Sequence, residues 1–101
     1  MDFNELSDKA ISKELGNRLK ARRLEMNVTQ EKLAHETTLS LNVIKSLEKG
    51  KGKLSTLIAF LRELKALDQL NHFIPEVGIS PLQLARMRGK ERQRASSKRL
   101  P

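Results

Sequence analysis

Apolar residues recur at helical spacing along most of the chain. In residues 7–25, Ile11, Leu15 and Leu19 lie four positions apart among charged side chains, which is the spacing of one face of a helix. A later segment carries a denser stripe, typical of a helix that faces a core, made of Leu54, Leu57, Ile58, Leu61 and Leu64. The pattern therefore predicts a long first helix and a buried fourth one.

Two short helices are predicted between these segments from their capping residues. Thr29 is a good N-cap for a helix from Gln30 to Glu36, and Ser40 for a helix from Leu41 to Lys49. Gly50 then stands where a helix commonly ends in the left-handed conformation. Residues 37–40 form the connection. The residues expected to face inward are Leu33, Ala34, Leu39, Ile44 and Leu47.

A fifth helical segment is expected to follow, with Asp68 as its cap, Leu67, Leu70, Phe73 and Ile74 as its apolar residues, and Pro75 as its end. Beyond a linker, residues 80–83 read Ser-Pro-Leu-Gln, which is typical of a helix start. That last helix should end near Gly89, and residues 90–101 are nearly free of apolar side chains and should be disordered.

The chain of 101 residues has 20 Lys+Arg against 12 Asp+Glu, a net charge of +8. Residues 86–101 hold seven of the basic side chains and only one acidic one. This asymmetry favours a polyanionic partner, nucleic acid first, although a tail that only improves solubility is the alternative.

The composition also argues against several classes of protein. There is no cysteine, so a disulfide framework and thiol catalysis are excluded. His35 and His72 lack the neighbours of a metal site, and no nucleophile–base pair or glycine-rich phosphate loop occurs. The longest apolar run, residues 57–61, is too short to span a bilayer. We expect a cytoplasmic protein that is not an enzyme and uses no metal or cofactor.

The two short helices have the spacing of a helix-turn-helix. In such a motif the second helix enters the major groove and the first helix fixes its angle. The second helix therefore needs apolar residues inward and short polar or basic residues outward. The outward set would be Ser40, Leu41, Asn42, Lys45, Ser46 and Lys49, with Lys51 and Lys53 beside the DNA backbone.

At these residues the sequence resembles the phage-repressor-type (Xre) helix-turn-helix family. The matching motif within residues 15–67 includes the runs LGNRLK (residues 15–20), TQEKLA (29–34) and LEKG (47–50). The resemblance implies an all-α, lambda-repressor-like domain of five helices that binds operator DNA as a dimer. It also implies that Gln30 touches a phosphate and that Arg23 and Glu48 form a structural ion pair. The family's usual glycine in the turn is Thr38 here, so the turn must avoid a positive φ or tolerate strain.

The second half of the chain is similar to HipB-type antitoxins, which are encoded beside HipA-like kinase toxins. The similar runs are residues 57–64, 67–76 and 80–96. The resemblance implies a homodimeric repressor of its own operon that assembles with the kinase. Contacts with the second copy or the partner are expected at Leu70, Phe73, Ile74, Leu82 and Met87.

The sequence thus predicts four regions: an N-terminal extension with the start of the first helix (1–14), the helix-turn-helix domain (15–75), a linker with a short C-terminal helix (76–89) and a basic tail (90–101). Two other functions stay open. One is a stand-alone phage or restriction–modification regulator. The other is an interaction protein that mainly inhibits a partner enzyme, which the apolar Leu41 and Val43 on the expected reading face would favour.

Overall fold

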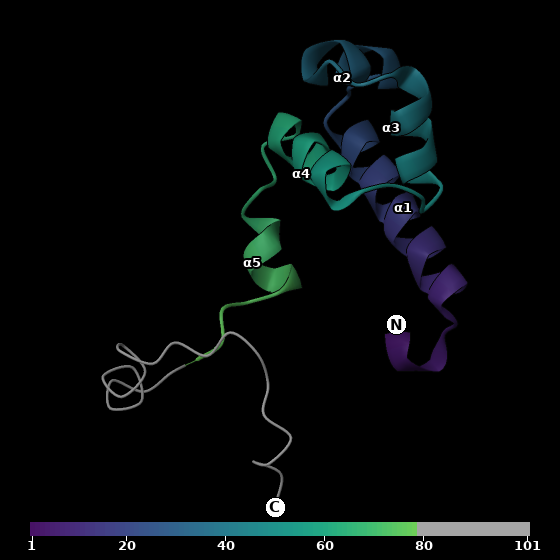
Figure 1. Cartoon of the computed structure of the whole chain (residues 1–101), viewed down its shortest axis with the longest axis vertical. Coiled ribbons are helices and arrows are strands. Elements are labelled where there is room, and N and C mark those ends of the chain that lie inside the picture. Colours follow the sequence, from purple (N-terminus) through teal and green to yellow (C-terminus); the bar gives the residue numbers. More distant parts are fainter. Residues whose placement is uncertain (79–101) are drawn as a thin grey trace, which may run out of the picture.

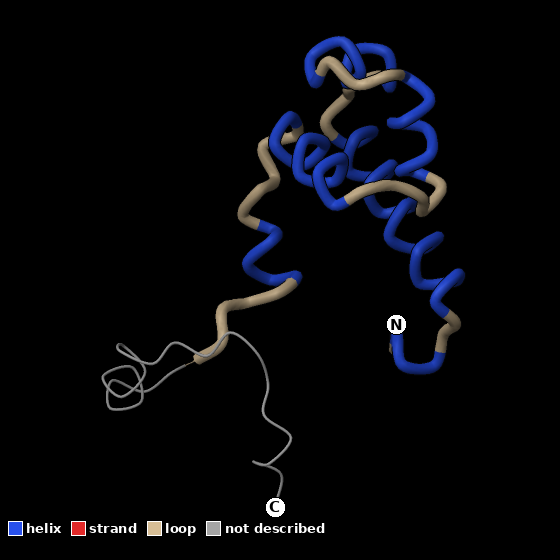
Figure 2. Tube along the Cα trace, in the orientation of Figure 1, coloured by secondary structure: helices blue, strands red, loops and turns tan. Residues whose placement is uncertain are grey.

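The computed structural model describes residues 1–78. These residues form five α-helices and one short 3-10 helix, and contain no β-strand (Figures 1 and 2). The elements are η1 (Phe3–Glu5), α1 (Asp8–Glu25), α2 (Gln30–Thr37), α3 (Leu41–Glu48), α4 (Leu54–Glu63) and α5 (Gln69–Phe73). The all-α, lambda-repressor-like arrangement of five helices is confirmed. The expected C-terminal helix and basic tail lie outside the described residues.

Hydroxyl caps set the starts of the first three α-helices. The side chains of Ser7, Thr29 and Ser40 each accept a hydrogen bond from the backbone N–H three residues later, at 3.1, 3.0 and 3.1 Å. Each bond satisfies one of the N–H groups that a helix start leaves without a partner. The two short helices therefore begin where the sequence predicts. The first of them is one residue longer than expected and the second one residue shorter.

Two features near the ends of the described chain differ from the sequence-based expectation. Asp68 does precede α5, but it lies in helical conformation and its side chain makes no capping hydrogen bond. At the N-terminus, η1 was not predicted. It folds back onto α1, where the guanidinium of Arg18 lies 5.1 Å from the centre of the Phe3 ring and pairs with Glu14 at 2.8 Å.

The core lies where α2, α3 and α4 meet. Its largest fully buried side chains are Leu33, Ile44, Phe60 and Leu64, one or two from each of these helices or their ends. α1 packs on α3, and α4 packs on both α2 and α3 (Figure 1). α3 is therefore supported on its inner side by three helices, and only its outer face is left for a partner.

Two glycines let α1 approach the end of α3 at backbone distance. A Cβ on Gly16 would lie 2.5 Å from the carbonyl oxygen of Glu48, and a Cβ on Gly50 would lie 2.5 Å from that of Ser12. Gly50 also has a φ of +89°, which favours glycine. The contact fixes which face of α1 lies against α3.

We expect Gly16→Ala to destabilise the domain although alanine is the better helix former. Overpacking costs about 1–3 kcal/mol, and here the upper end applies because the obstructing atoms are backbone. Helix propensity returns about 1 kcal/mol, so a net loss of about 2 kcal/mol should appear in urea denaturation. As a control, Ala21→Gly on the exposed side of α1 should cost only about 1 kcal/mol. A more stable Gly16→Ala variant would contradict the contact.

The sequence allowed two possibilities for the turn before α3, a turn without a positive φ or a strained one, and the structure has the strained one. Thr38 has φ +60° and ψ +17°, a left-handed conformation that costs a residue with a Cβ about 1–2 kcal/mol. Thr38→Gly removes this strain but adds about 0.5–1 kcal/mol of backbone entropy cost. We expect a net gain of about 0.5–1 kcal/mol in unfolding free energy, and no such gain for Thr38→Ala, which keeps the Cβ.

Candidate nucleic-acid interface

α2 and α3 are joined by the three residues from Thr38 to Ser40. The turn is tied to α2 because the Thr37 hydroxyl donates to the Leu33 carbonyl at 2.7 Å and accepts from the Leu39 N–H at 3.3 Å. Of the five residues expected to face inward, Leu33, Ile44 and Leu47 are buried, and Ala34 and Leu39 are half-buried against the core. The pair has the connection length and packing of a helix-turn-helix.

The outer face of α3 is a polar stripe. Asn42, Lys45, Ser46 and Lys49 are exposed, and their spacing of three and four residues places them on one side of the helix. Ser40 is also exposed, but its oxygen serves as the cap of α3. Leu41 is half-buried at the start of the stripe. The structure therefore brings the predicted base-facing residues together on a free surface.

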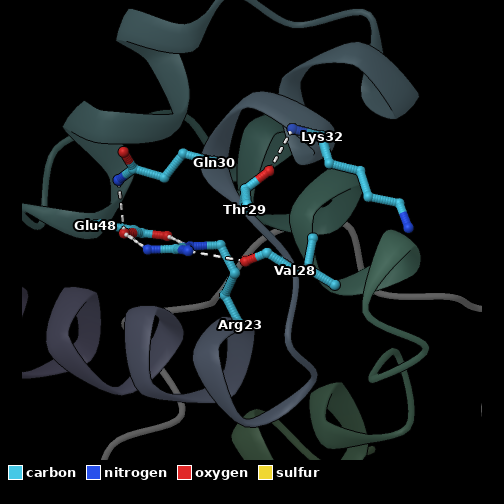
Figure 3. Close-up of polar contacts among 6 residues, drawn as sticks. All are labelled: Arg23, Val28, Thr29, Gln30, Lys32 and Glu48. Atoms are coloured by element: carbon cyan, nitrogen blue, oxygen red, sulfur yellow. Dashed lines mark hydrogen bonds and ion pairs between the residues drawn. The ribbon is translucent and has the colours of Figure 1, made fainter.

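A buried polar network holds α2 against α3 (Figure 3). The Arg23 guanidinium donates twice to the Glu48 carboxylate, at 2.6 and 3.0 Å, and once to the Val28 carbonyl at 2.9 Å. Both side chains are nearly fully buried, with 6% and 4% exposed. The structural ion pair that the sequence resemblance implied is thus present. It joins the end of α1 to the end of α3.

Gln30 belongs to the same network. Its amide nitrogen donates at 2.9 Å to Oε1 of Glu48, which also accepts one of the two bonds from Arg23. The side chain is therefore oriented by a buried acid (Figure 3). An amide nitrogen carries two hydrogens, and this bond uses one of them. The other is compatible with the phosphate contact expected for Gln30, which stays a prediction.

A cleft of about 340 Å³ lies beside this network, between α1 and α3. It is lined by Lys13, Asn17, Lys20, Gln30, Lys45, Glu48 and Lys49. The three residues from α1 were not among the sequence-predicted site residues. Their spacing of four and three residues puts them on one helix face, but the sequence alone does not say that this face adjoins α3.

The other residues predicted to contact DNA or protein lie in the connection after α3, on α5 and beyond it. Lys51 and Lys53 are exposed in the connection between α3 and α4. Leu70 on α5 is half-buried against the core. Phe73 and Ile74 are 53% and 72% exposed, so they are free for a second protein surface. Leu82 and Met87 lie outside the described residues.

A comparison with models of known protein families found a match for this chain. Residues 19–66 match the family model described as Helix-turn-helix. The match runs from the second half of α1 to just beyond the end of α4. It covers a little under half of the chain, slightly less than the 15–67 of the sequence resemblance. The matched segment contains the turn, α3 and the Arg23–Glu48 pair, and the match indicates a DNA-binding regulator.

Comparison of the chain with curated proteins found no match. Within residues 1–78, no helix is long and apolar enough to cross a membrane.

Proposed function

We propose that this protein is a transcriptional repressor that reads duplex DNA with α3. The observation that carries the proposal is the polar stripe of Asn42, Lys45, Ser46 and Lys49, exposed on a helix whose other side is buried. In the major groove, an Asn side chain pairs well with adenine and a Lys side chain with guanine. Asn42 and Lys45 would therefore supply direct readout, with Ser40, Leu41 and Ser46 beside them.

Much of the affinity should come from phosphates and DNA shape. Leu41 can contact a thymine methyl group but cannot hydrogen-bond a base edge, and Val43 is 36% exposed on the same helix. With few polar readers, phosphate contacts and the deformability of the site carry more of the binding energy. We expect Gln30, Lys49 and Lys51 to contact phosphates at the two ends of the motif.

We further propose a homodimer. Two-fold related helix-turn-helix domains bind half-sites about one helical turn apart, which doubles the short footprint of one α3. The exposed side chains of Phe73 and Ile74, beside half-buried Leu70, supply an apolar surface on α5 that a second copy would cover. The resemblance to HipB-type antitoxins supports a dimeric repressor of its own operon, with a HipA-like kinase as partner.

A binding experiment with the upstream region of the protein's own gene tests this proposal. We expect a gel shift on that DNA at concentrations where random duplex of equal length does not shift, and a changed shift when the neighbouring gene product is added. Absence of a kinase gene next door would favour a stand-alone regulator. Equal binding to both duplexes would contradict the repressor.

One observation favours a second candidate, an interaction protein that inhibits a partner enzyme. Half-buried Leu41 and partly exposed Val43 give α3 more apolar surface than DNA contact needs. In that case the partner would bind α3 tightly, and DNA would compete for the same surface only weakly.

A further inference from the structure

We infer that the cleft between α1 and α3 binds a phosphate of the DNA backbone, which extends the interface from α3 onto the first helix. The inference rests on the proposed DNA binding. Its specific content is that Lys13, Asn17 and Lys20, none of which the sequence marks as DNA contacts, act together with Lys45 and Lys49.

The position of these α1 side chains is fixed by packing. Gly16 lies with its Cα against the backbone of Glu48 and Gly50, so this face of α1 cannot turn away from α3. Asn17 and Lys20 follow Gly16 by one and four residues, and Lys13 precedes it by three. Residues at this spacing flank the contact on one side of the helix. Their exposed side chains are therefore held along the edge of α3.

The cleft is strongly positive. Four lysines line it, namely Lys13, Lys20, Lys45 and Lys49, and the single acid among its lining residues is Glu48. The charge of Glu48 is already neutralised by its bidentate ion pair with Arg23. Like charges gathered around one opening repel one another, and a bound anion removes that repulsion.

Neutral donors at the cleft suit a phosphate oxygen. Gln30 is the first residue of α2 and lines the cleft, with its amide oriented by Glu48. Asn17 adds a second amide from α1. Lysines supply charge, while amide N–H groups fix the position of the oxygens they bind.

The location of the cleft favours a backbone phosphate over a free ligand. Lys45 and Lys49 belong both to its lining and to the outer stripe of α3. A duplex that receives α3 in its major groove therefore brings the adjoining sugar–phosphate backbone to the same lysines. Contacts from α1 would reach a phosphate at the edge of that groove.

The test compares the salt dependence of duplex binding for the full chain and for the double variant Lys13→Gln/Lys20→Gln. Each lost lysine–phosphate contact should make the slope of log K against log salt shallower by about 0.9, and the loss should affect operator and random duplex alike. The matched control is Lys32→Gln/Arg62→Gln, which removes the same charge from exposed positions outside the cleft; Lys32 extends away from Gln30 (Figure 3). Its slope should stay closer to that of the unchanged chain.

A slope for the cleft variant equal to that of the control would overturn the inference, provided that thermal melting shows both variants folded. Titration with tripolyphosphate distinguishes a DNA phosphate from a free one. If the unchanged chain bound tripolyphosphate tightly and the cleft variant did not, while both bound duplex DNA equally well, the DNA assignment would also be overturned. Failure of the proposed function would give a different result. In that case the unchanged chain would bind operator no better than random duplex, whatever the cleft contributes.

Discussion

Replacing Glu48 with alanine is expected to destabilise the domain strongly, as much as truncating a core side chain. The substitution leaves the Arg23 guanidinium buried, with only the Val28 carbonyl as a remaining partner from the network, and frees the Gln30 amide. Breaking a buried ion pair by removing one partner costs about 3–5 kcal/mol, because the other charge stays uncompensated. Chemical denaturation followed by circular dichroism measures the loss directly.

A double-mutant cycle separates the pair from the individual side chains. Arg23→Met should also destabilise, but Arg23→Met/Glu48→Leu should lose much less than the sum of the two single losses, since no charge is left buried. As a control for removing a glutamate, Glu14→Ala at a half-buried position on α1 breaks only the pair with Arg18, which is worth about 1 kcal/mol at most. Additive losses in the cycle would contradict the coupling.

The second large effect is expected on DNA binding rather than on stability. Asn42→Ala/Lys45→Ala removes the two side chains best placed to read base edges, and each good base contact contributes about 1–3 kcal/mol of discrimination. The double variant should therefore lose about 2–6 kcal/mol of specific binding to the operator, with little change for random duplex. Quantitative gel shift or fluorescence anisotropy with both duplexes gives the two affinities.

Since both side chains are exposed, the double variant should melt like the unchanged protein. Asn4→Ala/Lys32→Ala makes the same pair of substitutions at exposed positions outside the proposed interface, and it should leave specific binding intact. Equal affinity for operator and random duplex, both before and after the Asn42→Ala/Lys45→Ala change, would favour the protein that mainly holds a partner enzyme, because its DNA binding would carry no sequence specificity.

The local elements were largely predictable from sequence because their signals are local. Ser40 and Thr29 cap the helices that they were expected to cap, since a hydroxyl three residues before a free N–H acts within one turn. Asp68 did not cap, because α5 begins from helical backbone. Thr38 shows the opposite limit: its positive φ was one of two possibilities, and only the packed turn selected it.

The helix-turn-helix motif and the outward residues of α3 also follow from the order of residues alone. Periodicity of 3.6 separates an inward face with Ile44 and Leu47 from an outward face with Asn42 and Lys45, and the structure agrees. The Arg23–Glu48 pair could be expected only through resemblance to a family, because its partners are 25 residues apart and no local rule connects them.

The residues that meet in the cleft beside α3 are brought together only by the tertiary structure. In the sequence, Lys13, Asn17 and Lys20 are merely polar positions on a charged helix, and nothing distinguishes them from the other polar residues of that helix. They adjoin Lys45 and Lys49 because Gly16 and Gly50 admit a backbone contact that sets the rotation of α1. Sequence therefore determined the helices and which side of each is polar, since those depend on neighbours within a turn. The joining of two polar faces into one site depends on how helices pack, which is set by atoms far apart in the chain.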